Sequence, residues 1–251
     1  MRSPALSRAR GLLRALRMLT HVLAGLAAIR FRFAALAPAE REQRVQAWAR
    51  TALDLMSIEL QVRGQAPSHG PLLLVANHIS WLDILAIHAA CYCRFVSKAD
   101  VRHWPLIGRL VSGAGTLYVE RESRRDALRV VHHMAERLRQ GEVITVFPEG
   151  TTSDGAGLLP FHANLLQAAL SAAAPVQPLA LQFLDRGTQR VSLAPAYIGD
   201  DSLLASLWRT FCTDGIVARV SFGDPQQALA RSRRQWASDL HAEVKALMQA
   251  A

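Results

Sequence analysis

The chain has 251 residues, of which 51% are hydrophobic; this is enough for one full-sized domain with a large core and excludes a disordered or collagen-like chain. The formal net charge of +9 favours a polyanionic partner, which includes nucleic acid, an anionic membrane surface and a phosphorylated substrate. The three cysteines, Cys91, Cys93 and Cys212, are too few for a disulfide framework, and we expect buried thiols in a reducing compartment.

Residues 1–37 combine arginines with an apolar run. The run MLTHVLAGLAAI, residues 18–29, lies between an arginine-rich start and the pair Arg30 and Arg32. Twelve helical residues rise only ~18 Å, against ~30 Å of hydrocarbon in a bilayer. We therefore expect a membrane-associated helix that lies in the interface or dips into it. A spanning helix and a cleaved signal peptide are the alternatives.

From residue 38 onward, segments with helical periodicity alternate with short apolar segments, and no linker interrupts them. Helices are expected over 39–58, from Ile84, within 99–115, from a capping box at Ser123 to Gly141, over 158–174 and over 226–250. Strands are expected over 59–64, 71–77, 94–98, 116–120, 142–147, 175–184, 191–198 and 216–222. The alternation predicts that residues 38–251 form a single α/β sandwich, in which helices cover a largely parallel or mixed sheet.

The stretch NHISWLD, residues 77–83, places polar side chains between two apolar runs. Ser80 and Asp83 have the spacing of a capping box, which would make both of them a plain helix start. That interpretation leaves Asn77 and His78 unexplained, at the carboxyl end of a strand where open α/β sheets bind ligands. If His78 folds back over the first helical turn, Asp83 accepts from one imidazole nitrogen and the other nitrogen becomes a proton acceptor. The alternative to the helix cap is therefore a general base with its orienting carboxylate.

Two more stretches follow predicted strands. In VFPEGTTSDG, residues 146–155, we expect the amides of Gly150, Thr151 and Thr152 to be free and to face the cleft, where such donors bind phosphate or an oxyanion. A plain polar turn is the alternative. Arg121 closes the stretch GTLYVER at a strand end, where a guanidinium can bind a phosphate through two nitrogens; a solvated surface arginine is the alternative.

In this order and spacing, these segments resemble the lysophosphatidate acyltransferase family over roughly residues 70–185. NHISWLD matches the family's first motif, GTLYVER its second, FPEGTTS its third and VQPLAL its weaker fourth, and FVSK before WPLIG is also similar. One departure concerns the segment after the third motif. The family often has Phe-Lys-x-Gly there, whereas residues 161–164 read Phe-His-Ala-Asn. The resemblance therefore leaves the acceptor's head group open.

The resemblance implies transfer of a fatty acyl group from acyl-CoA or acyl carrier protein to the free hydroxyl of a lysophospholipid. The implied acceptor is 1-acyl-glycerol-3-phosphate, giving phosphatidate; lyso-ornithine lipid or another lysolipid is the alternative. His78 would take the hydroxyl proton while Asp83 holds the imidazole. Lys98 and Arg121 match the family's phosphate-binding positions. Glu149 would contact the substrate or orient Arg121, and the turn at Gly150 and Thr151 would stabilise the oxyanion.

No metal or redox cofactor is expected, since the sequence contains no metal-ligand or nucleotide-binding motif. The partners implied are membrane lipids and the acyl donor, at the cytoplasmic face of the inner membrane. Nucleic-acid binding is disfavoured because the arginines cluster at the termini and aromatics make up only 6% of the chain. A catalytically silent lipid-binding scaffold is the remaining non-enzyme alternative.

Overall fold

The structure, a computed structural model, describes residues 4–119 and 124–250. Within these ranges a seven-stranded sheet has the order β1-β7-β6-β2-β5-β3-β4. Strands β2 to β6 all run in one direction, and the edge pair β1 and β7 runs in the opposite direction. The strands are β1 (Glu59–Arg63), β2 (Leu72–Ala76), β3 (Arg94–Lys98), β4 (Leu117–Val119), β5 (Val143–Val146), β6 (Val176–Asp185) and β7 (Ile216–Phe222).

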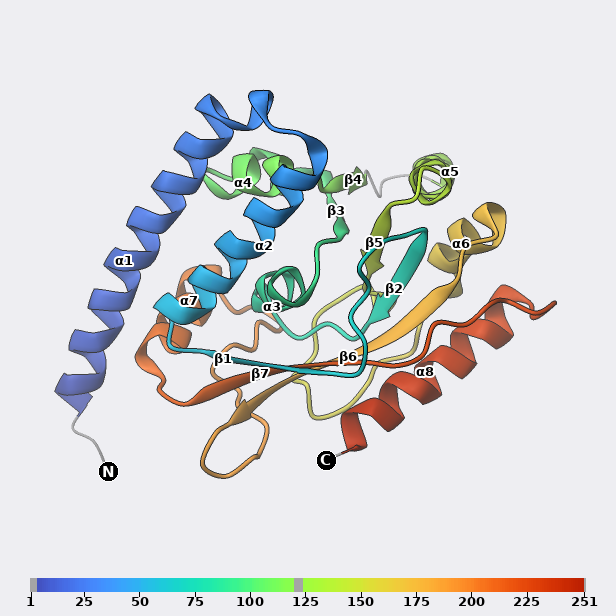
Figure 1. Cartoon of the computed structure of the whole chain (residues 1–251). Helices are drawn as coiled ribbons and strands as arrows, with labels where there is room; N and C mark the ends of the chain where they lie inside the picture. Colours follow the sequence, from blue (N-terminus) through green and yellow to red (C-terminus); the bar gives the residue numbers. More distant parts are fainter. Residues whose placement is uncertain (1–3, 120–123, 251) are drawn as a thin grey trace.

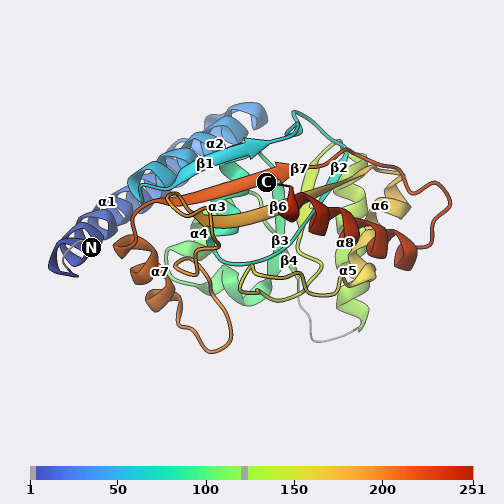
Figure 2. The same cartoon turned by 90° about the horizontal axis from the view of Figure 1, so that it is seen from below.

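Helices cover both faces of the sheet (Figure 1). On one face lie α2 and α3, with α1 outside them and α7 beside α1; on the other face lie α5, α6 and α8 (Figures 1 and 2). The helices of the described chain are α1 (Pro4–Phe31), α2 (Pro38–Leu55), α3 (Leu82–Ala90), α4 (Ile107–Gly113), α5 (Arg124–Arg139), α6 (Gln167–Ala172), α7 (Leu203–Cys212) and α8 (Arg233–Gln249). The expected α/β sandwich with a mixed sheet is therefore confirmed.

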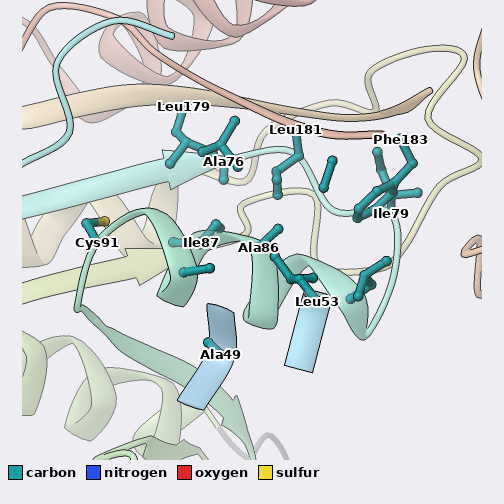
Figure 3. Close-up of a cluster of buried hydrophobic side chains, with 14 of the residues drawn as sticks. Ala49, Leu53, Ala76, Ile79, Ala86, Ile87, Cys91, Leu179, Leu181 and Phe183 are labelled. Carbon is teal, nitrogen blue, oxygen red and sulfur yellow. The ribbon is translucent and has the colours of Figure 1, made fainter. Parts of the chain in front are cut away.

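Strand β2 explains why its sequence reads as an unbroken apolar run. Leu72, Leu74 and Ala76 point into the core under α2 and α3, whereas Leu73 and Val75 point into the core under α5, α6 and α8. Figure 3 shows part of the first core, where side chains of β2 and β6 meet those of α3 and α2. A strand buried on both faces has no polar alternation, and β2 is accordingly a central strand of the sheet.

Residues 191–198 do not form the expected strand. Only an isolated bridge joins Val191 to Leu184, and the chain then continues as a loop. Pro195 has no N–H to give to a ladder, and Leu193 is 58% exposed, so neither hydrogen bonding nor burial favours a strand here. The loop is instead attached to the first motif, because the Tyr197 amide donates to the Ile79 carbonyl over 3.2 Å.

Two expected helices begin later than their sequence pattern indicates. Within 158–174, helical structure starts only at Ala163, after Pro160 and after the His162 amide has donated to the Pro148 carbonyl over 2.8 Å. Within 226–250, α8 starts at Arg233, where Ser232 and Gln235 form a reciprocal capping box. The expected capping box at Ser123 lies outside the described residues, and α5 is described from Arg124 onward.

Helix α1 is much longer than the apolar run 18–29 from which we expect a membrane-associated helix. It extends over 28 residues, and over Ala5–Phe31 it is long and apolar enough to cross a membrane by length and composition alone. It nevertheless packs on the domain. Arg14 donates to the carbonyls of Phe211 and Thr213 and forms a 2.6 Å ion pair with Asp214. Arg10 binds the other oxygen of that carboxylate at 2.5 Å.

Candidate active site

His78 and Asp83 meet at the carboxyl end of β2. The chain leaves the strand after Ala76 and enters α3 at Leu82, so His78 lies in the connecting turn. Its Nδ1 lies 2.6 Å from Asp83 Oδ2, with Asp83 fully buried and the His78 side chain 22% exposed. With Nδ1–H as the donor to the carboxylate, the neutral imidazole presents Nε2 as a proton acceptor.

Asp83 serves the helix start and the histidine at the same time. Its Oδ2 also accepts the amides of Ile79 at 2.7 Å and Ser80 at 3.0 Å, while Ser80 Oγ accepts the amide of Leu82 at 3.2 Å. The histidine-partner interpretation is therefore geometrically fulfilled, whereas the capping box is only half formed: Asp83 accepts the Ser80 amide, but Ser80 Oγ accepts the amide of Leu82 and not that of Asp83. The backbone bonds fix the carboxylate, and the carboxylate in turn fixes the plane of the imidazole.

Asn77 extends the sheet beyond the end of β2. Its Nδ2 donates to the Leu181 carbonyl at 3.0 Å, and its Oδ1 accepts the Leu181 amide at 2.7 Å. A fully buried side chain thus takes over the hydrogen bonds that β6 would otherwise exchange with a strand. This anchors the peptide immediately before His78.

The third motif holds the backbone of His78 from both sides. Glu149 Oε1 accepts the His78 amide at 2.6 Å, and the Ser153 amide donates to the His78 carbonyl at 2.8 Å. Glu149 Oε2 accepts the Leu159 amide at 2.9 Å. Burial raises the pKa of the Glu149 carboxyl above its ordinary value, against the hydrogen bonds from Leu159 and His78, which lower it.

These contacts occupy Glu149 with the backbone, whereas the expected contacts with a substrate phosphate and with Arg121 stay predictions, since Arg121 lies outside the described residues. The residue is only 4% exposed, and each of its oxygens already accepts a backbone amide. A second anion beside a buried carboxylate would also be repelled. We therefore assign Glu149 to positioning the His78 peptide.

Phe147, the residue before the third motif's proline, stacks on the ring of His78. The ring centroids are 4.0 Å apart and the planes differ by 11°. Phe95 of β3 stacks on Phe147 in turn, with centroids 5.9 Å apart. The contacts of Phe147 and of Ser153 with His78 escaped the sequence analysis, because nothing in a single sequence pairs the ends of two strands that are 70 residues apart.

The turn after Glu149 differs from expectation at Gly150. Its φ of +72° suits glycine, but its amide donates to the Phe147 carbonyl at 3.1 Å and is therefore not the free donor that we expected. Thr152 Oγ1 donates to the Tyr197 carbonyl. The amide of exposed Thr151 has no hydrogen-bond partner among the described residues. Thr151 thus remains the candidate oxyanion donor of this turn.

Of the two expected cations, the structure describes one. Lys98 is exposed and ends β3, at the same edge of the sheet as His78, and it pairs in register with Val119 of β4. Arg121 and the end of the expected strand 116–120 lie outside the described residues. Within 4–119 and 124–250, no group of three or more His, Cys, Asp or Glu side chains could hold a metal ion.

A histidine held by a buried carboxylate, at the carboxyl end of a central strand of a mixed α/β sheet, lies where such sheets bind ligands and has the geometry of a general base. A family model described as Acyltransferase matches residues 57–182, which include both of the motifs that meet at His78. The chain therefore belongs to the acyltransferase family.

Curated relatives agree with this assignment, and a solved structure agrees with the fold. The chain is 38% identical over 186 residues to the 1-acyl-sn-glycerol-3-phosphate acyltransferase of Neisseria gonorrhoeae, and the aligned segment covers 74% of this chain and 72% of the relative. It is 41% identical over 169 residues to the lyso-ornithine lipid O-acyltransferase of Pseudomonas aeruginosa, covering 67% and 64%. The crystal structure of the acyltransferase PlsC from Thermotoga maritima matches with a TM-score of 0.69 over 97% and 98% of the chains; at 18% identity it shows the fold alone.

Proposed function

We propose that this acyltransferase moves a fatty acyl group from a thioester, on CoA or acyl carrier protein, to the free hydroxyl of a lysophospholipid. The observation that carries the proposal is the 2.6 Å contact between His78 Nδ1 and the buried Asp83 carboxylate, in a member of the acyltransferase family. A lipid hydroxyl is a weak nucleophile, and a histidine held in this way is suited to remove its proton as it attacks.

The proposed reaction needs no covalent enzyme intermediate. The lipid oxygen attacks the thioester carbonyl while its proton passes to His78 Nε2, and Asp83 stabilises the imidazolium. The carbonyl carbon then expels the thiolate, the C–S bond breaks, and the proton on His78 returns to sulfur. The amide of Thr151 is the proposed donor to the oxyanion of the tetrahedral intermediate.

We propose 1-acyl-glycerol-3-phosphate as the acceptor, with phosphatidate as the product. The Neisseria relative carries that substrate in its name, and Lys98 with Arg121 would supply cations for the phosphate. Lyso-ornithine lipid is the second candidate, because the Pseudomonas relative named for it is 41% identical. His162, which lies beside Gly150 at a position where the family often has a lysine, leaves the choice between the two head groups open.

We place the reaction at the cytoplasmic face of the membrane. Lysolipid and product both reside in the bilayer, and the thioester carriers come from the cytosol. The exposed leucines of α1, together with the arginines at the N-terminus, support an interfacial position. The buried Arg14 supports it further, because a helix that crossed the bilayer would have to separate this side chain from Asp214.

One experiment tests both the acceptor and the donor. The purified protein is given acyl-CoA or acyl-loaded acyl carrier protein and a panel of lysolipids, and the products are separated by mass. We expect phosphatidate as the main product from 1-acyl-glycerol-3-phosphate. Preferred formation of ornithine lipid would favour the second candidate. Absence of any acylated lipid with either donor would contradict the proposed function.

A further inference from the structure

A second apolar surface lies next to α1, on α7 and the loop before it. Leu204 and Trp208 are four residues apart on α7, with exposures of 78% and 43%, and Leu193 and Ile198 of the loop are 58% and 39% exposed. We call these four side chains the α7 surface. The opposite face of the same helix is buried through Ser206, Thr210 and Phe211. The helix is therefore amphipathic, and its apolar outer face has nothing packed over it in the described chain.

The loop that carries part of this surface is held firmly on α7. Ser206 Oγ donates to the carbonyls of Pro195 and Ala196 at 3.2 Å, and Thr210 Oγ1 donates to that of Ala194 at 3.3 Å. Arg209 donates to the Ala196 carbonyl and also pairs with Asp201. The exposed side chains are thus presented on a fixed scaffold.

The helix that carries the α7 surface packs against α1. Helices α1 and α7 lie side by side at one end of the molecule in both views (Figures 1 and 2). A Cβ on Gly11 of α1 would approach Cys212 Sγ of α7 to 2.5 Å, so the contact at this position leaves no room for a side chain. The outer face of α1 carries four exposed leucines at helical spacing, Leu12, Leu16, Leu19 and Leu23, and between them the exposed Arg17.

The same element is joined directly to the candidate active site. Trp81, between His78 and Asp83, donates through Nε1 to Ser206 Oγ of α7 at 3.1 Å. The Tyr197 amide donates to the carbonyl of Ile79, and the Tyr197 carbonyl accepts from Thr152 of the third motif. Whatever binds the α7 surface is therefore fixed relative to the histidine.

We propose that the α7 surface is a second bilayer-binding element, which acts with α1 to hold the active site against an anionic lipid surface. Leucine and isoleucine side chains gain free energy on leaving water, and a half-exposed tryptophan is suited to the headgroup boundary. The exposed arginines of α1, Arg8, Arg17 and Arg30, supply attraction to anionic headgroups. The inference rests on the proposed function only where it says why the protein binds a bilayer. Bilayer binding itself can be measured without acyl transfer.

Flotation of the full chain with vesicles of phosphatidylglycerol and phosphatidylethanolamine tests the proposal. Leu204→Glu places a charge on the α7 surface, and we expect it to lower the partition coefficient roughly tenfold. Leu128→Glu is the matched control, because Leu128 is 69% exposed on α5 at the other end of the molecule. We expect this control to bind as the unmodified protein does. Equal partitioning of the two variants would overturn the proposal.

Fluorescence provides a second measurement, in which the substitution keeps an aromatic apolar side chain on the surface. Brominated phospholipids quench tryptophans that enter the bilayer, so Trp208→Phe should remove a substantial share of the quenchable emission. The same quenched fraction with and without Trp208 would overturn the proposal. A stable dimer in lipid-free solution that Leu204→Glu dissociates would also overturn it, because a second copy of the chain would then cover this face. Loss of vesicle binding in Leu204→Glu, in a protein that acylates no lysolipid, would leave this inference standing and reject the proposed function.

Discussion

A single oxygen of Asp83 connects the fold with the proposed chemistry. Oδ2 accepts from the imidazole of His78 and from the amides of Ile79 and Ser80. The amides belong to the turn that carries the histidine, so the carboxylate fixes the ring and the backbone that supports it together. Asp83 is fully buried, and a buried carboxylate is tolerated only with such hydrogen bonds.

Glu149→Gln tests the positioning role of Glu149. The glutamine carbonyl can still accept one amide, but its NH₂ group faces the second amide and cannot accept from it. Because the His78 peptide then loses part of its support, we expect kcat to fall roughly 10–100-fold, with KM for the lysolipid nearly unchanged. Steady-state kinetics check this. A raised KM at constant kcat would instead favour the substrate contact that the sequence suggested.

Arg121→Ala tests the proposed phosphate site. Loss of a charge-assisted contact is worth about 1.5–3 kcal/mol, so we expect KM for the lysolipid to rise roughly 10–100-fold. Arg121→Lys should recover only part of this, because an ammonium lacks the paired geometry of a guanidinium. The KM for the acyl thioester should remain unchanged. Equal losses toward both substrates, with a lower melting temperature, would mean that Arg121 supports the fold.

The elements of this protein differ in how far their sequences determine them. The central strand β2 and the turn NHISWLD could be predicted, because an apolar run followed by cap-spaced polar residues has few other solutions. The segment 191–198 could not be, since its alternation of apolar and small residues also suits a loop that packs on α7. Tertiary contacts with Ser206 and Ile79 favour the loop over the strand, and a local sequence pattern does not contain such contacts.

The candidate site shows the same division. The pairing of His78 with Asp83 follows from local spacing, because they are five positions apart across one turn. The support from Glu149 and Phe147 arises only when β5 lies beside β2 in the sheet. The amide of Gly150 was misjudged because the turn's own hydrogen bond to Phe147 depends on backbone angles that the residue types permit but do not impose.

Helix α3 contains a histidine that should make the fold sensitive to acid. His88, in the last turn, is buried beside Phe95, and burial lowers its pKa from 6.5 to about 4. The unfolded chain therefore binds more protons than the folded one between these pH values, so stability is lost as the pH falls through that window.

His88→Leu should remove this contribution. On acidification from pH 7 to pH 4, we expect the free energy of unfolding to fall less in the variant than in the unmodified protein, by up to about 3 kcal/mol. Urea unfolding at several pH values measures this difference, in which the other titrating groups largely cancel. The same pH dependence in both proteins would show that His88 is protonated in the folded state or takes a partner there.

At the scale of the whole molecule, one carboxylate joins two arginines of α1 to the folded domain. Asp214 pairs with Arg10 and with the buried Arg14, and it lies in the turn between α7 and β7. The helix for which we propose membrane binding is thereby fixed to α7, which also contacts the candidate active site through Trp81. The proposed membrane binding and the proposed catalysis would then depend on one rigid arrangement.

Asp214→Ala should loosen α1. Because Arg14 would lose its charged partner while remaining largely buried, we expect a destabilisation of about 1–3 kcal/mol and faster tryptic cleavage within residues 8–17. Asp201→Ala is the matched control, since Asp201 is similarly exposed but pairs with Arg209. Equal cleavage rates in the two variants would mean that the apolar contacts of α1 hold the helix without the ion pair.

The central claim, that His78 is the general base of an acyl transfer to a lysolipid, is tested most directly by one rate. Acyl transfer to 1-acyl-glycerol-3-phosphate is measured for His78→Ala, with His132→Ala as the control because His132 is an exposed histidine of α5. We predict that His78→Ala keeps its melting temperature and loses roughly 10²–10⁴-fold in kcat, whereas the control keeps its activity. Near-normal turnover by a folded His78→Ala variant would contradict the account.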